Sequence, residues 1–84
     1  MSRISEENKE KIKSSVLRIL FDESPKSISA RFIAQEEARD KQFILKLLKE
    51  LEKDKVVENV TAEFSRKSFW IMTNEAYKKY RELL

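Results

Sequence analysis

Cationic and amide side chains recur at helical spacing in residues 40–53. Ile44, Leu48 and Leu51 form one apolar stripe of this stretch. The opposite side carries ammonium and amide groups, those of Lys41, Gln42, Lys46 and Lys49. Ammonium groups suit phosphates and the guanine edge, and a glutamine amide matches the adenine edge. Clustered lysines also release condensed counterions from a polyanion. The pattern predicts contact with double-stranded DNA, and the alternative is an ordinary solvated helix face.

Two further groups of basic and hydroxyl side chains flank this stretch. The segment Ser65-Arg66-Lys67-Ser68 (65–68) joins two strand-like runs, so its cations would stand at the tip of a ribbon. Arginine at such a tip can enter a minor groove, and lysine or serine can hold phosphate; the alternative is a polar turn kept soluble by charge. Ser29 and Arg31 open a short helical block, where backbone N–H groups can also hold phosphate. The alternative for Ser29 is that it is simply a helix cap, and it can have both roles. Arg39 precedes the longer helix, and we include it among the expected DNA-contacting residues.

Two apolar residues near the cationic face support a different function. Leu45 and Phe43 would form, together with Trp70, an exposed apolar patch for docking in a larger protein assembly. The Trp70 side chain could also stack on a base, anchor a partner or pack over a helix. We favour packing for Trp70 and DNA contact for the stretch 40–53.

The composition argues against catalysis and against bound cofactors. The chain has no Cys, no His and no Gly. It therefore lacks thiolates, the commonest metal ligand and a phosphate-cradling loop. Carboxylate pairs such as Glu36 and Glu37 stand beside basic residues, and we interpret them as surface charges. We expect no enzyme activity, no metal site, no cofactor and no small-molecule ligand, so that regulation would come from abundance or from a partner.

The 84 residues are expected to form a single domain, 1–84. No run of 18 or more apolar residues is present, and the N-terminus lacks the apolar core of a signal peptide. We therefore expect a cytoplasmic protein without membrane contact. The net charge is +3 and the sequence pI is about 9.2. Acids and bases balance up to residue 23, so the positive surplus lies downstream of it.

Spacing and capping residues predict helices over residues 5–22, 30–36, 41–53 and 74–84, with Ser29 and Asp40 as N-caps. Asp54 or Lys55 must take the left-handed conformation that a glycine usually takes after a helix. A hairpin is expected from runs 56–64 and 68–72, with a four-residue loop. This register places Phe64 opposite Phe69 and Ala62 opposite Ile71 on the core face. Trp70 and Met72 would then point away from the core.

Three segments together resemble the winged helix-turn-helix family. They are the run Ser29-Ala30-Arg31-Phe32-Ile33-Ala34, residues 44–57 with their leucine spacing, and the tail Ser68-Phe69-Trp70-Ile71-Met72-Thr73. The resemblance implies an α+β, mostly helical fold with three core helices, a β-hairpin wing and a C-terminal helix. It also implies DNA binding by a small transcription regulator, often a homodimer, although some members bind RNA or dock proteins instead.

The last predicted helix has a broad apolar side, as the first helix has. This side is formed by Tyr77, Tyr80, Leu83 and Leu84. Such residues are most often core, but two broad faces also suit a two-fold dimer interface. We expect a homodimer that reads two half-sites about 34–36 Å apart.

Overall fold

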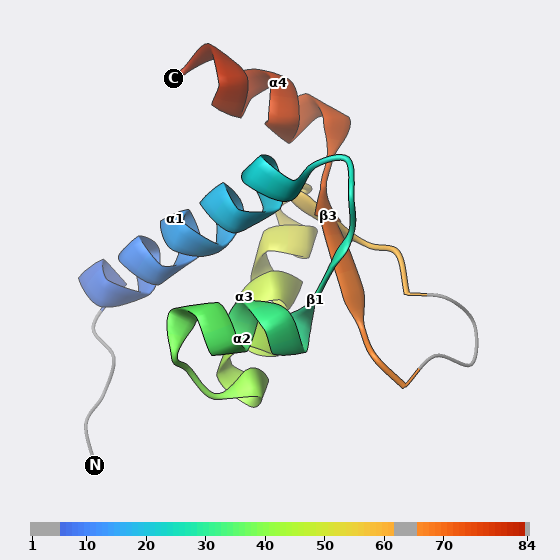
Figure 1. Cartoon of the computed structure of the whole chain (residues 1–84). Coiled ribbons are helices and arrows are strands. Elements are labelled where there is room, and N and C mark those ends of the chain that lie inside the picture. Colours follow the sequence, from blue (N-terminus) through green and yellow to red (C-terminus); the bar gives the residue numbers. More distant parts are fainter. Residues whose placement is uncertain (1–5, 62–65, 84) are drawn as a thin grey trace.

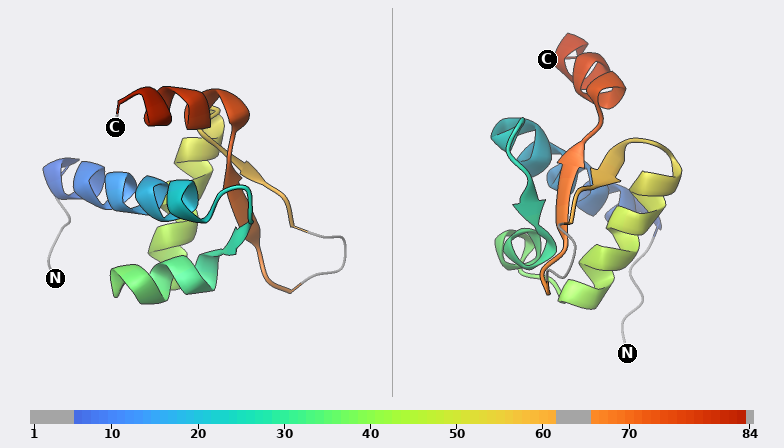
Figure 2. Two further views of the ribbon diagram at one scale, coloured as in Figure 1. Left: turned by 45° about the horizontal axis from the view of Figure 1, so that its top comes forward. Right: turned by 90° about the vertical axis from the view of Figure 1, so that its right-hand side faces the viewer.

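The computed structural model describes residues 6–61 and 66–83, which form four helices and a three-stranded antiparallel sheet (Figure 1). In chain order the elements are α1 (Glu6–Glu23), β1 (Ile28–Ser29), α2 (Ala30–Glu37), α3 (Lys41–Lys53), β2 (Val57–Asn59), β3 (Phe69–Met72) and α4 (Asn74–Glu82). The helices expected from apolar spacing are confirmed. α1, α2 and α3 pack around one core, and α4 lies on the side away from α2 (Figures 1 and 2).

Each of the first three helices buries one apolar stripe. In α3 that stripe is Ile44, Leu47, Leu48 and Leu51, all at most 5% exposed. The stripe meets Val16 and Leu20 of α1 and Ile33 of α2 in a single cluster. Because the stripe must face inward, the rotation of α3 about its own axis is fixed. The polar residues between the stripe positions are therefore directed to solvent.

Polar N-caps begin α2 and α3, and residues other than glycine take the left-handed conformation after each of these helices ends. The Ser29 Oγ accepts from the Phe32 N–H at 3.1 Å, and an Asp40 carboxylate oxygen accepts from the Gln42 N–H at 3.1 Å. Both predicted caps are confirmed. Ala38 (φ 53°) closes the turn between α2 and α3, and Lys55 (φ 62°) follows α3. The predicted strain after α3 therefore falls on Lys55, and the helix-turn-helix forms without glycine.

The predicted hairpin register is wrong by four residues. Val57 pairs with Met72 and Asn59 with Trp70, and the Val60 N–H donates to the Phe69 carbonyl at 2.9 Å. Phe69 therefore lies opposite Val60 rather than Phe64, and the connection is longer than four residues. The part of the prediction that concerns Ala62, Phe64 and Ser65 lies outside the described residues.

The predicted faces of the hairpin are also inverted. Trp70 is 1% exposed and Met72 4%, so both lie in the core, whereas Ile71 is only partly buried. The reason is a third strand: β3 is central, and its Trp70 pairs with Ile28 of β1. Both strand runs carry apolar residues on both faces, so period two alone could not choose between them.

A side-chain turn ends β2. The Asn59 Oδ1 accepts from both the N–H and the hydroxyl of Thr61, and the Thr61 Oγ1 accepts from the Phe69 N–H at 3.0 Å. A threonine hydroxyl thus takes the place of a ladder carbonyl. Asn and Thr side chains compete with sheet hydrogen bonds in this way, which is why the strand stops at Asn59 although the β-rich sequence continues.

Candidate nucleic-acid interface

The base of the wing is tied to the start of α2. The Ala30 N–H donates to the Ser68 carbonyl at 3.0 Å, and Ser29 pairs with Phe69. The N–H groups of a helix's first turn have no intrahelical acceptor, so the wing supplies one. Arg66 and Lys67, which precede Ser68, are thereby held beside the N-terminus of α2.

This arrangement closes a hollow of about 240 Å³ between α2, α3 and the wing, which we call the basic hollow. Its lining residues all carry a cation or a hydroxyl: Ser29, Arg31, Lys41, Arg66, Lys67 and Ser68. No acid of the described residues lines it. The Ser68 Oγ is buried, with no hydrogen-bond partner in the part of the chain that the structure describes. Residues that the sequence analysis singled out in three separate segments thus line one small site. Ser68 contributes a buried hydroxyl to this site, and the sequence analysis did not distinguish it from the other residues of the segment 65–68.

The outward face of α3 forms a second, shallow hollow of about 340 Å³, which we call the α3 hollow. It is lined by Gln42, Leu45, Lys46 and Lys49. The two lysines and the glutamine are exposed, while Leu45 also packs partly against the core. The polar face predicted for residues 40–53 is therefore present and accessible.

Of the two acids of α3, Glu50 and Glu52, Glu50 is engaged by lysines of α1. The Glu50 carboxylate lies 2.9 Å from the Lys9 Nζ and 3.3 Å from the Lys13 Nζ, both on α1. These hydrogen-bonded ammonium groups lower the pKa of Glu50. Among the described residues, no ion pair within 4 Å involves Lys41, Lys46 or Lys49. The Glu50 contacts join α3 to α1. Glu50 lies one helical turn from Lys46, but its carboxylate pairs with the α1 lysines, which leaves Lys46 and Lys49 available to a polyanion.

Arg39 lies outside both hollows. It is exposed and lines a separate depression between α2 and α3, to which Arg31 and Lys41 also contribute. Burial raises the pKa of the nearby Glu37, and the positive charge of Arg39 opposes this rise. Arg39 therefore extends the positive surface beyond the basic hollow without joining it.

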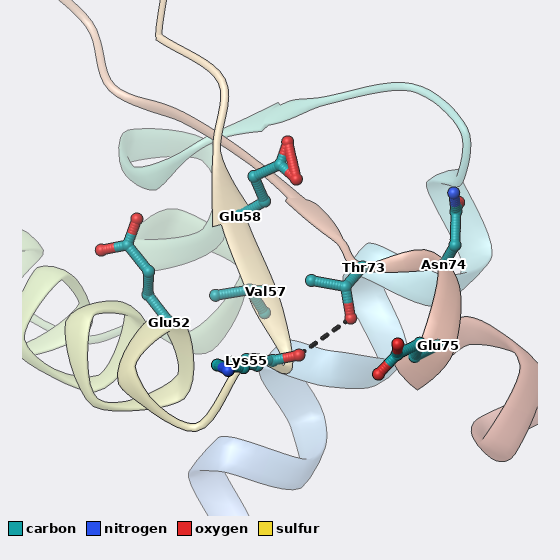
Figure 3. A pocket seen from close by; sticks show the side chains of 7 residues that line it. All are labelled: Glu52, Lys55, Val57, Glu58, Thr73, Asn74 and Glu75. Carbon is teal, nitrogen blue, oxygen red and sulfur yellow. Dashed lines mark hydrogen bonds between the residues drawn. The ribbon is translucent and has the colours of Figure 1, made fainter.

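The hollow near the other end of α3 is mainly acidic. It has a volume of about 410 Å³, lies between β2 and the start of α4, and is lined by three acids and one base, Lys55. Figure 3 shows Glu52, Glu58 and Glu75 around it, and the Thr73 hydroxyl donating to the Lys55 carbonyl at 3.0 Å. Like charges repel a polyanion at this end. Within the described ranges, no group of three or more acids, His or Cys could hold a metal ion.

The apolar residues considered for partner contacts are mostly buried. Trp70 is 1% exposed, so its predicted packing role is confirmed, and the patch proposed from Phe43, Leu45 and Trp70 does not form. Phe43 and Leu45 are partly buried against the core. The apolar docking surface expected from the sequence therefore lacks Trp70.

On α4, internal packing and exposure divide the predicted dimer residues. Tyr77 and Tyr80 pack on Phe21 of α1, with ring centroids 4.8 and 4.7 Å away. Leu83 is 84% exposed, and Leu84 lies outside the described residues. The two tyrosines therefore attach α4 to α1 within one chain, and Leu83 is the residue of this set that faces solvent.

No protein-family model matches the chain, and no curated protein matches it significantly. Solved structures do match in fold. The Staphylococcus aureus MepR–DNA complex superposes with a TM-score of 0.77 at 20% identity, covering 92% of this chain and 64% of that one. The structure of Lactococcus lactis ZitR in an apo form superposes with a TM-score of 0.73 at 20% identity, covering 92% of this chain and 57% of that one.

A third match comes from an archaeon. AF1382 of Archaeoglobus fulgidus gives a TM-score of 0.75 at 17% identity, with 87% of this chain and 80% of that chain covered. The chain spans little more than half the length of the ZitR structure and of a MepR variant, at 57% and 53%. No described helix has the length and apolar character needed to cross a membrane. With α2 and α3 as the helix pair and β2 and β3 as the wing, this chain has the winged helix-turn-helix fold.

Proposed function

We propose that this protein binds double-stranded DNA and acts as a transcription regulator. The observation that carries the proposal is the basic hollow, in which Arg31, Lys41, Arg66 and Lys67 from three elements line one cavity that no described acid enters. Cations gathered in this way bind a phosphate backbone by releasing its counterions. The same fold occurs in MepR, which has been solved as a DNA complex.

In this proposal the two hollows have different tasks. α3 lies in the major groove, where Gln42, Lys46 and Lys49 face base edges and groove walls. The basic hollow holds the backbone beside the groove, with Ser29 and Arg31 from α2. Lys41 contributes from α3, and Arg66 and Lys67 from the wing. Arg39 adds a long-range attraction from the neighbouring surface.

Charge segregation supports this orientation more than net charge does. A net charge of +3 is small for 84 residues. The hollow at the N-terminal end of α3 is basic, however, and the hollow beyond its C-terminal end is lined by three glutamates and one lysine. Such an asymmetric field favours approach of a polyanion with the N-terminal end of α3 foremost.

The test is affinity for a duplex as a function of salt. Fluorescence anisotropy with a labelled 20-base-pair duplex should show affinity falling by about 10³-fold or more between 50 and 200 mM salt, the range expected for six or more phosphate contacts. A single strand of the same length serves as the comparison. Absence of duplex binding at 50 mM salt would refute the proposal.

We also propose that the protein acts as a homodimer through α4 and the adjoining face of α1. Support comes from Leu83, which is exposed beside the partly buried Tyr77 and Tyr80. Leu84 belongs to the same proposed interface. A two-fold arrangement would place two copies of α3 in successive major grooves.

A further inference from the structure

The α3 hollow combines one amide, one apolar side chain and two ammonium groups. We propose that Gln42 and Leu45 read adenine–thymine pairs in the major groove: the Gln42 amide bonds adenine N6 and N7, and Leu45 contacts the thymine 5-methyl group. This inference rests on the proposed DNA binding and specifies which bases the protein prefers.

Gln42 has the position and the freedom that the contact needs. It is the second residue of α3, and the N-terminal residues of a recognition helix are those that reach base edges. Asp40 supplies the cap to the Gln42 backbone N–H, so the side chain is not used for capping. The side chain is exposed and lines the α3 hollow. Its amide can offer a donor and an acceptor together, as adenine requires.

Leu45 supplies the complementary apolar surface. It packs partly against the core, which fixes its position, and the rest of it lines the α3 hollow. Thymine alone presents a methyl group in the major groove. A fixed apolar side chain among polar neighbours therefore discriminates in favour of thymine, and a DNA contact accounts for the solvent-facing side of this leucine.

Helical spacing brings the two contacts to the same place on DNA. Gln42 and Leu45 are three residues apart, so they lie on one helix face, about 4.5 Å apart along the axis. Base pairs rise about 3.4 Å. The two side chains therefore reach the same or adjacent base pairs. Lys46 and Lys49, on flexible stems, are left to phosphates at the groove walls.

The first experiment selects bound sequences from duplexes with 20 random base pairs. Wild type should enrich an adenine–thymine pair at a fixed position, and Gln42→Ala should lose that preference while keeping salt-dependent binding. Asn74→Ala is the matched control, because it removes an exposed amide from the first turn of α4 that does not line the α3 hollow. Enrichment that is identical for wild type and Gln42→Ala would overturn the role of Gln42.

The second experiment changes the DNA and leaves the protein intact. In the selected duplex, uracil replaces thymine and removes only the methyl group. Wild-type affinity should fall about fourfold, the value of one buried methyl group, and Leu45→Ala should show no such difference between the two duplexes. Equal losses for both proteins would overturn the role of Leu45.

The outcomes distinguish a failure of this inference from a failure of the proposed DNA binding. Steep salt dependence without base preference would remove the inference and leave DNA binding intact. Absence of duplex binding by wild type would refute both.

Discussion

The backbone N–H of Ala30, the first residue of α2, donates to the carbonyl of Ser68, immediately before β3. This bond joins the helix-turn-helix to the wing across 38 residues of sequence. It holds Arg66 and Lys67 beside Ser29 and Arg31, and so the basic hollow depends on it. The bond is a structural contact whose presence can be measured without any substitution.

Amide hydrogen exchange measures this contact directly. N–H groups in the first turn of a helix ordinarily exchange fast, because they lack intrahelical acceptors. We expect the Ala30 amide to be protected by at least about tenfold relative to that of Arg31, the next residue in the same turn. NMR of the free protein in deuterated buffer gives both rates in one experiment. Equal rates would mean that the wing base is not docked in solution.

Removing the wing cations should weaken duplex binding without unfolding the domain. Arg66 and Lys67 are exposed and line the basic hollow. For Arg66→Ala with Lys67→Ala we expect at least a tenfold loss of affinity. The slope of log affinity against log salt concentration should become shallower by about two, since each lost phosphate contact reduces this slope by about one. Urea unfolding should change little.

The matched control for the wing is Lys78→Ala with Lys79→Ala. It removes the same charge from exposed positions on α4, away from the basic hollow. Its affinity should stay within about threefold of wild type, because neither lysine lines the basic hollow or the α3 hollow, and salt screens exposed charges that make no direct contact. Equal losses for the two double variants would show that net charge, and not the wing, determines binding.

Local sequence signals predicted the helices of this chain well. The stripe Ile44, Leu48 and Leu51 determines the rotation of α3, and hence which lysines face solvent. Ser29 and Asp40 mark the helix starts by a local chemistry that depends on neighbouring residues only. For the same reason the exposure of Lys41 and Gln42 could be predicted without knowledge of tertiary structure.

The sheet could not be predicted in the same way, because its register depends on contacts that are distant in sequence. Ile28 pairs with Trp70, and this third strand selects the face of β3 that enters the core. Thr61 ends the β2 ladder through its hydroxyl, which the alternation of apolar residues does not reveal. The basic hollow likewise depends on Ala30 meeting Ser68, a contact with no signature in either local segment.

The contact between Glu50 and the α1 lysines should make stability depend on pH. The folded-state pKa of Glu50 is lowered from its ordinary 4.5. Its contribution is therefore present above the unfolded-state pKa and lost as pH falls through the folded-state pKa. Glu50→Gln should cost about 1 kcal/mol or less at pH 7, because the carboxylate is partly exposed.

Urea unfolding of wild type and Glu50→Gln across pH tests this sign. The difference in unfolding free energy should be largest near pH 7 and should shrink below about pH 4, as the carboxylate takes up a proton. Glu52→Gln is a suitable control, since Glu52 is an exposed acid of the same helix and no described residue pairs with it within 4 Å. A difference that grows as pH falls would contradict the assignment.

Exposure of Leu83 provides the sharpest test of the proposed dimer. Sedimentation velocity at micromolar concentration should give a dimer for wild type. Leu83→Ser should weaken it at least tenfold, because each protomer would lose a buried leucine worth about 1.5–3 kcal/mol. Since Leu83 is 84% exposed in the single chain, its replacement should leave the stability of the monomer unchanged. Lys78→Ser on the same helix is the control, because it places the same serine at an exposed position of α4 without removing an apolar side chain. A wild-type monomer at this concentration would defeat the proposal.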